Sequence, residues 1–230
     1  VISHTSDMHP WFIESQKTKK NKYTDWYVWS GKDKNHLPNN WLSVFGGSSW
    51  KWNENRKMFF LHNFLDSQPD LNFHNPEVQE QMLKEIKFWL DFGIDGFRFD
   101  VINFIFHDKE LRDNPLKDKS EVRPLGFNKD NPYGLQHHIY DNTQREVPAY
   151  LQKIRMLLDE YGAISIGEVV SDKPFETIAA YTNDDRLHMA YCFEFLSEEF
   201  DLNTVDVIAE KFFKENPNSW PCWAFSNHDS

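Results

Sequence analysis

Short apolar runs that each end in an acidic residue recur along this chain, and they restrict the fold more than any other feature. In Gly96-Phe97-Arg98-Phe99-Asp100, strand alternation buries the two phenylalanines on one side and directs Arg98 and Asp100 to the other. Glu168 ends a second run and Asp229 ends a third. Because helical segments separate these runs, we expect the three carboxylates to converge at the carboxyl end of one parallel sheet.

The segments between the runs have the sequence signals of helices. Asn75 and Pro76 are a suitable start for a helix that Gly93 ends, and a second apolar stripe runs from Val147 to Gly162. Shorter helices are expected near 175–180 and 205–213, and strands near 1–5, 96–102, 163–169, 189–195 and 221–226. This alternation predicts consecutive right-handed parallel units of an α/β fold.

The number of strands favours part of a (β/α)8 TIM-type barrel, with about five of its eight strands present. A doubly wound sheet also fits the alternation, but the Gly-x-Gly-x-x-Gly turn is missing from the sequence and the acids follow three separate strands. No turn precedes Val1, and Ser230 lies where a strand-to-helix loop should begin. Both ends are therefore expected to lie inside a longer catalytic domain.

Composition favours a neutral partner. The formal net charge is -11 and the one basic cluster, Lys17 to Lys22, lies in a polar loop, which argues against a nucleic-acid partner. Aromatic residues make up 16% of the chain, and several tryptophans occur in polar, loop-like sequence where flat rings suit sugars. No run approaches the roughly 18 to 20 apolar residues that span a bilayer, and we expect no signal peptide. We expect a cytoplasmic protein that acts on a small oligosaccharide or glucoside and binds neither a membrane nor a nucleic acid. The oligomeric state stays open.

Cys192 and Cys222 are expected to be buried free thiols.

The three acids suit the retaining cleavage of a glycosidic bond, which needs a carboxylate nucleophile and a carboxylic acid about 5 to 5.5 Å apart. Arg98 can hold Asp100 in its charged form, and the apolar neighbours of Glu168 favour its protonated form. Asp229 is then available to stabilise an oxocarbenium-like transition state. His4 and His228, at strand ends of the same face, are expected to donate hydrogen bonds to sugar hydroxyls.

Other interpretations of these residues exist. A single strand-end aspartate most often caps a helix or turn, and a single histidine is usually an ordinary loop residue. The same acids also suit a metal site, but His-x-His, His-Glu-x-x-His and calcium-loop spacings are all missing from the sequence. Three acids at three strand ends favour a shared catalytic site.

At these residues the chain resembles glycoside hydrolase family 13, the α-amylase superfamily, and within it the α-glucosidase and oligo-1,6-glucosidase branch. Val1 to His4 resembles the end of the first conserved region of that family, and Gly96 to Asp100 the second. Ile166-Gly167-Glu168-Val169 is similar to the third, and Phe225-Ser226-Asn227-His228-Asp229 to the fourth. The resemblance implies that Asp100 is the nucleophile, Glu168 the general acid/base and Asp229 the transition-state stabiliser, with His4, Arg98 and His228 as sugar contacts.

The resemblance also implies a domain organisation. Residues 21–73 resemble the domain B inserted after the third barrel strand, so 1–20 and 74–230 would form the partial barrel. Gln68-Pro69-Asp70-Leu71-Asn72 is a motif typical of the oligo-1,6-glucosidase branch. Phe45 is similar to a pocket-lining aromatic residue, although a packed hydrophobic patch explains it equally well. Val101 resembles the valine that accompanies use of α-1,6 bonds, although alternation also allows it to pack away from the site.

Ser3 stands where many relatives have an asparagine that helps to hold calcium. No cofactor is therefore expected, and a calcium site is possible only outside this sequence. The implied function is a retaining exo-acting α-glucosidase. Two alternatives stay open, namely a transglycosylase or isomerase of the same branch and a non-catalytic relative that keeps the barrel as a scaffold.

Overall fold

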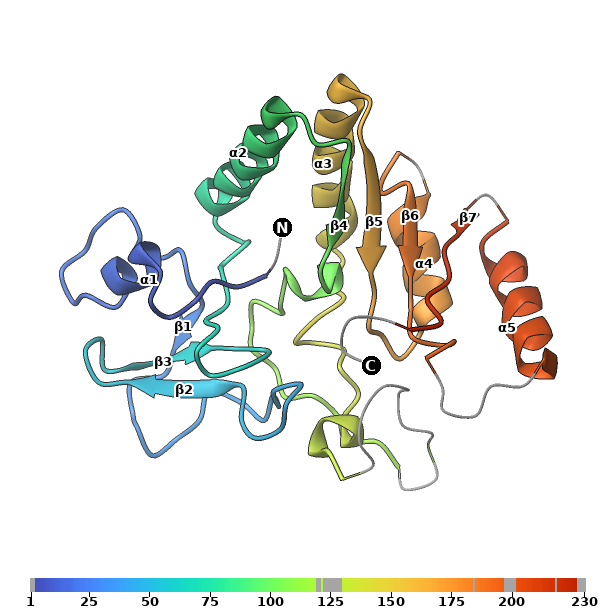
Figure 1. Ribbon diagram of the computed structural model, residues 1–230. Helices are drawn as coiled ribbons and strands as arrows, with labels where there is room; N and C mark the ends of the chain where they lie inside the picture. The colour runs from blue at the N-terminus through green and yellow to red at the C-terminus, as the bar shows by residue number, and fades with distance from the viewer. Residues whose placement is uncertain are drawn as a thin grey trace.

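The computed structural model describes residues 3–118, 121, 130–183, 185–196, 202–217 and 219–226. Its central feature is a parallel sheet in the order β4-β5-β6-β7 (Figure 1). The strands are β4 (Gly96–Phe99), β5 (Ile164–Glu168), β6 (Met189–Tyr191) and β7 (Trp220–Pro221). Each neighbouring pair is parallel, so the α/β prediction is confirmed for this part of the chain.

Helices connect these strands and cover one face of the sheet (Figure 1). The helix α2 (Pro76–Phe92) begins where the side chain of Asn75 accepts a hydrogen bond from the Glu77 N–H at 3.0 Å, and it ends at Gly93. Gly93 has a φ of 102°, a left-handed conformation that costs glycine little. The crossovers are α3 (Val147–Tyr161), α4 (Pro174–Thr182) and α5 (Leu202–Glu215). All four helices were predicted from the sequence.

The main core lies between this sheet and the helices. The stripe of α3 supplies Leu151, Ile154 and Leu158, all fully buried, and Phe99 of β4 is also fully buried. Phe97 packs against the same core and stacks on Phe99 with 5.7 Å between ring centroids. The alternation predicted for β4 is therefore confirmed, and it leaves Arg98 and Asp100 on the other side of the strand.

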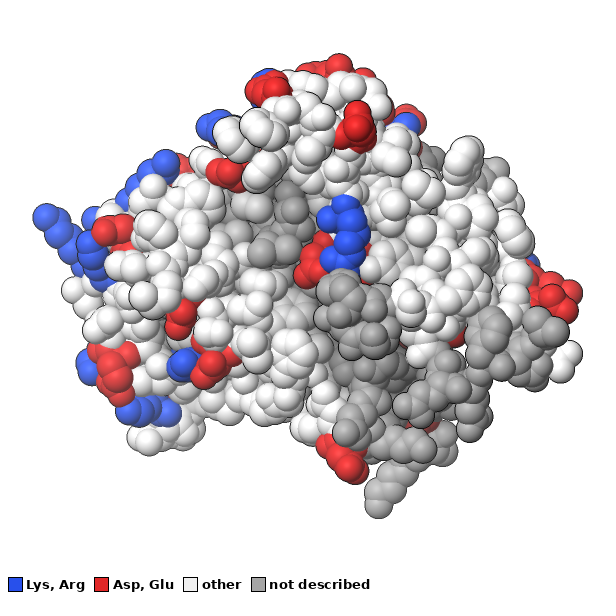
Figure 2. All heavy atoms as spheres, viewed as in Figure 1, with Lys and Arg blue, Asp and Glu red and all other residues white. Residues whose placement is uncertain are grey.

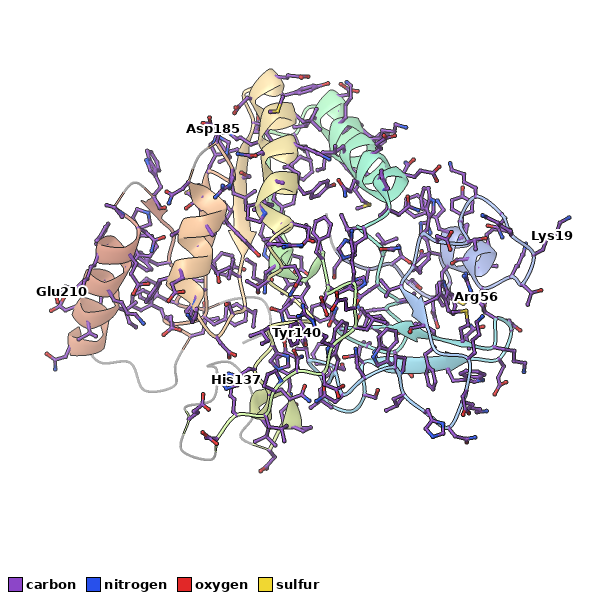
Figure 3. All side chains as sticks on the ribbon, turned by 180° about the vertical axis from the view of Figure 1, so that it is seen from behind. Lys19, Arg56, His137, Tyr140, Asp185 and Glu210 are labelled. Carbon is purple, nitrogen blue, oxygen red and sulfur yellow. The ribbon has the colours of Figure 1, made fainter. Side chains whose placement is uncertain are left out.

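A second, antiparallel sheet lies beside the parallel one, in the order β1-β3-β2 (Figure 1). It consists of β1 (Trp29–Ser30), β2 (Trp50–Asn53) and β3 (Met58–Leu61), with α1 (Pro10–Ser15) packed near it. Arg56 joins the two, since its Nη1 donates to the carbonyls of Ser15 and Thr24 at 2.6 Å (Figure 3). The boundaries 1–20, 21–73 and 74–230 stay a prediction.

Three strand predictions need correction. His4 forms an isolated antiparallel bridge with Asp70, because the backbone of residues 3–5 bonds to residues 69–71 instead of the parallel sheet. Residues 1 and 2 lie outside the described residues. β6 ends at Tyr191, and β7 is limited to two residues because Pro221 has no N–H to donate to the ladder. The described parallel sheet has four strands, where five were predicted.

Two short 3-10 helices complete the chain, η1 (Ile102–Phe104) directly after β4 and η2 (Pro132–Leu135). Cys192 is buried, Cys222 is half-buried, and both are free thiols. Among the described residues, no helix has the length and apolar character needed to cross a bilayer. On the face shown in Figure 2, Lys and Arg side chains are scattered at the periphery with one small mixed-charge group near the centre, so this face carries no basic stripe.

Candidate active site

Strand register brings Asp100 and Glu168 together. β4 and β5 pair in parallel with Phe99 opposite Gly167, so Asp100 and Glu168 are the next residues at the same edge of the sheet. Glu168 is in turn opposite Tyr191 of β6. The carboxyl ends of three adjacent strands therefore hold three side chains in a row, as the carboxyl edge of a parallel sheet allows.

The guanidinium of Arg98 connects both carboxylates. Its Nη1 donates to Asp100 Oδ1, and its Nη2 lies 2.5 Å from Glu168 Oε1. Arg98 also donates from Nε and Nη2 to the hydroxyl of Tyr191, at 3.1 and 3.0 Å. Burial acts to lower the pKa of Arg98, but its contacts with Asp100, Tyr191 and Glu168 outweigh this and raise it overall. The guanidinium therefore stays charged between the two acids.

Glu168 is buried, with 3% of the residue exposed, and polar groups meet both of its oxygens. Tyr191 donates to Oε1 at 2.8 Å, and the Val101 N–H donates to Oε2 at 3.1 Å. We expected apolar neighbours around this carboxyl. The structure instead places polar partners there, because the flanking strands β4 and β6 carry Arg98 and Tyr191 to either side of β5.

Val101 has an unusual backbone conformation. Its φ of 34° is left-handed, which is uncommon for a β-branched residue, and the resulting turn directs its N–H at Glu168. Its side chain is buried with Phe104 and Tyr133, as the packing interpretation of the sequence predicted. A role of Val101 in linkage preference stays a prediction.

Asn103 ties the loop after β4 to the loop after β5. It is fully buried, its Nδ2 donates to the Val170 carbonyl at 2.7 Å, and its Oδ1 accepts from the Val170 N–H at 3.3 Å. A side-chain amide that bonds both the N–H and the carbonyl of one residue fixes the spacing of the two loops. Sequence reasoning missed this residue, since a single asparagine after a strand carries no distinguishing signal.

His4 lies near Asp100 and is held by the Gln68-Pro69-Asp70 segment. Gln68 Nε2 lies 3.1 Å from His4 Nε2, and the residue is 8% exposed. Burial lowers the pKa of His4, while the negative charge of Asp100 acts in the opposite direction. A neutral imidazole close to Asp100 has one donor nitrogen, which agrees with the predicted sugar contact and does not test it.

Aromatic rings extend from His4 towards the antiparallel sheet. Phe64 lies 5.2 Å from the His4 ring and 6.3 Å from Phe45, measured between ring centroids. Phe45 is 65% exposed and, with Phe64, lines a cavity of about 550 Å³. The other lining residues are Ser43, Gly46, Ser48, Trp50, Lys51, Trp52, His62, Leu65 and Asp66. The cavity is lined by residues between Ser43 and Asp66 and by none of the strand-end carboxylates, so the pocket role of Phe45 stays a prediction.

His228 and Asp229 lie outside the described residues, so the structure does not test their predicted roles. Among the residues that it does describe, no group of three or more His, Cys, Asp or Glu side chains is arranged to hold a metal ion. The expectation that no cofactor is needed stays a prediction.

Sequence reasoning also missed Tyr191. It falls inside a predicted strand and has no charge to mark it, and only the pairing of β5 with β6 places its hydroxyl against Glu168. The signal that could have identified Tyr191 is its position at the end of β6, the strand that pairs with the strand of Glu168.

Several known proteins are similar to this chain. The family model for the alpha amylase catalytic domain matches residues 1–230. A probable alpha-glucosidase of Rhizobium meliloti is 48% identical over 234 residues, covering 100% of this chain and 42% of that protein. An oligo-1,6-glucosidase of Parageobacillus thermoglucosidasius is 41% identical, covering 89% of this chain and 34% of that protein.

A crystal structure of the alpha-glucosyl transfer enzyme XgtA is similar to this chain with a TM-score of 0.94 and 49% identity, covering 99% of this chain and 43% of that one. The chain thus spans between 34% and 43% of the length of these relatives. The parallel sheet with its helical crossovers is part of a TIM-type barrel. The strand order, the family match and the close relatives all point to the same family. The chain therefore belongs to the alpha-amylase catalytic-domain family.

Proposed function

We propose that the full-length protein is a retaining, exo-acting α-glucosidase that cleaves short α-glucosides through a covalent glucosyl-enzyme. The contact of one guanidinium, Arg98, with both Asp100 and Glu168 carries this proposal. Two carboxyl groups on adjacent strand ends, both in contact with one cation, support the double displacement that retention requires. The names of the relatives in Rhizobium meliloti and Parageobacillus thermoglucosidasius support an α-glucoside as the substrate.

In the proposed mechanism, Asp100 attacks the anomeric carbon while Glu168 gives a proton to the leaving oxygen. The contact with Arg98 suits a nucleophile that carries negative charge. Glu168 then removes a proton from water, which releases glucose from Asp100. Asp229 is proposed to stabilise the positive charge on the sugar ring, and His4, Arg98 and His228 to contact its hydroxyls.

The stereochemistry of the first product tests this mechanism. With an aryl α-glucoside and the full-length protein, proton NMR within the first minutes should show α-glucose before mutarotation produces the β-anomer. Release of β-glucose first would replace the two-step mechanism by a single displacement. No glucose from aryl α-glucosides, maltose or isomaltose would reject the proposed function.

Transfer to a sugar or alcohol is the second candidate, and the similarity to the glucosyl transfer enzyme XgtA favours it. The chemistry as far as the glucosyl-enzyme is the same, so the acceptor separates the two functions. Adding a primary alcohol to the reaction and measuring the ratio of glucoside to glucose decides between them. A ratio well below one supports hydrolysis as the main reaction.

A non-catalytic role is disfavoured. An amino acid transporter heavy chain of Rattus norvegicus is 34% identical over 96% of this chain. The present chain, however, keeps Asp100 and Glu168 in contact with Arg98, and a scaffold has no need for paired acids. We further propose a cytoplasmic location, no bound cofactor, and a domain B formed by residues 21–73.

The linkage preference is proposed to include α-1,6 bonds, with Val101 as a contributor. Val101→Thr should shift the ratio of maltose to isomaltose hydrolysis towards maltose by roughly tenfold to a hundredfold, since one hydroxyl changes discrimination by about 1 to 3 kcal/mol. Both rates are measured for both proteins. Val147→Thr, which also buries a hydroxyl but in the α3 core, is the control. An unchanged ratio would leave Val101 as a packing residue.

A further inference from the structure

Tyr191 has a defined position beside the proposed general acid. It ends β6, it is opposite Glu168 in the parallel register, and 8% of the residue is exposed. Its ring lies 6.4 Å from that of Phe193 and 6.0 Å from the Arg98 guanidinium carbon. A buried tyrosine at a strand end normally needs a partner for its hydroxyl, and this one has two.

The direction of each hydrogen bond follows from the chemistry of the groups. Arginine only donates, so the Tyr191 oxygen accepts from Arg98 Nε and Nη2. The single hydroxyl proton is then left for Glu168 Oε1, 2.8 Å away. Burial, followed by the hydrogen bond to Glu168, raises the pKa of Tyr191 to about 12, so the hydroxyl keeps this proton at neutral pH. The bond therefore runs from Tyr191 to the carboxylate.

We propose that Tyr191 is a positioning residue that orients the Glu168 carboxyl through this hydrogen bond. The inference rests on the proposed function, because it assigns Tyr191 to the acid/base residue of that reaction. Among the described residues, three groups face the carboxyl: Arg98 from β4, Tyr191 from β6, and the Val101 N–H after β4. Of these, Arg98 is shared with Asp100, so Tyr191 is the side-chain donor that distinguishes Glu168 from the nucleophile.

The Tyr191 hydroxyl has two roles. By accepting hydrogen bonds from Arg98, it holds the guanidinium beside Glu168. By donating a hydrogen bond to Glu168 Oε1, it restricts rotation of the carboxyl. Without the hydroxyl, Arg98 loses a fixed acceptor, and Arg98 is the one partner that the described residues still offer to Glu168 Oε1. The proton of the acid is then delivered from a less restricted position, and misplacement of a catalytic group lowers the rate.

Tyr191→Phe in the full-length protein tests the proposal, since it removes the hydroxyl and keeps the ring. The kcat/KM for maltose should fall by about tenfold to a hundredfold, because its leaving group needs protonation. An aryl α-glucoside with an acidic leaving group should lose less than about threefold. In Tyr191→Phe the carboxylate lacks this hydrogen-bond donor, so the acid should keep its proton to a higher pH. The alkaline limb of the kcat/KM profile should move up by about one pH unit.

Tyr181→Phe is the matched control. Tyr181 is 2% exposed, and its hydroxyl has no hydrogen-bond partner among the described residues, so its removal should change neither substrate ratio nor pH profile. Equal losses of Tyr191→Phe on both substrates with an unmoved alkaline limb would make Tyr191 a packing residue and overturn the proposal. Full activity of this variant on maltose would overturn it as well.

A measurement that needs no turnover separates this inference from the proposed function. Infrared difference spectra against pH report the carboxyl band of Glu168, identified by its disappearance in Glu168→Gln. The midpoint of this band should lie about one pH unit higher in Tyr191→Phe than in the unchanged protein. An identical midpoint overturns the positioning role even if α-glucosides are cleaved. A shifted midpoint supports it even if the substrate proves to be another glycoside.

Discussion

Asp100→Asn in the full-length protein is expected to reduce hydrolysis of α-glucosides by about four to six orders of magnitude, the scale seen when a covalent nucleophile is removed. The amide has nearly the same volume as the carboxylate and no negative charge with which to attack. The fold should be retained, because Arg98 keeps its contacts with Glu168 and Tyr191. Initial rates on maltose and on an aryl glucoside, together with the thermal midpoint, are the measurements.

Asp95→Asn is the control for this prediction. Asp95 is exposed and lies just before the amino end of β4, away from the carboxyl edge that holds Asp100. It should leave both rates within about twofold, as surface substitutions usually do. A fluorinated α-glucoside that accumulates the glucosyl-enzyme should label the peptide that contains Asp100, and the label should be lost in Asp100→Asn. Label on another carboxylate would assign the nucleophile elsewhere.

Glu168→Gln is expected to separate substrates by their leaving groups. Maltose hydrolysis should fall by about 10³- to 10⁴-fold, because its leaving oxygen needs the proton. An aryl glucoside with an acidic phenol should still form the glucosyl-enzyme, which then accumulates because water lacks its general base. Pre-steady-state release of the phenol should therefore show a burst, followed by a slow steady state.

Azide provides the control for Glu168→Gln, since this anion attacks without a general base. It should accelerate turnover of the aryl glucoside by this variant and yield α-glucosyl azide, the product of retention. Asp100→Asn should not form the α-azide, since it has no glucosyl-enzyme to intercept. Equal losses of Glu168→Gln on both substrates, without rescue by azide, would remove Glu168 from the acid/base role.

Much of the helical framework was predictable because its signals are local. Asn75, Pro76 and Gly93 mark the ends of α2 through capping and backbone preference, and these effects act within one helical turn. Predicted strands were less accurate. Whether Ser3 to Thr5 joins a sheet depends on which backbone groups lie opposite, and those belong to residues about 65 positions further along the chain.

The candidate site likewise has one part that the sequence predicted and another that it did not. Alternation in Gly96 to Asp100 and the acid at the end of β5 predicted the contact of Arg98 with Asp100 and the approach of Asp100 to Glu168. The contact of Arg98 with Glu168 came only from the structure. The sequence could not predict that polar groups surround Glu168, since its neighbours along the chain are apolar. The polar groups come from β4 and β6, on either side of β5.

By itself the sequence determined the class of fold, the helices α2 to α5 and the residues that carry charge to the carboxyl edge of the sheet, because periodicity and caps are properties of adjacent residues. Only the tertiary structure decided which side chains meet there. The Tyr191 hydroxyl, the left-handed turn at Val101 and the amide of Asn103 act across strands or loops separated by 23 to 67 residues. Such contacts depend on strand register, which the pairing of whole strands sets and no local pattern encodes.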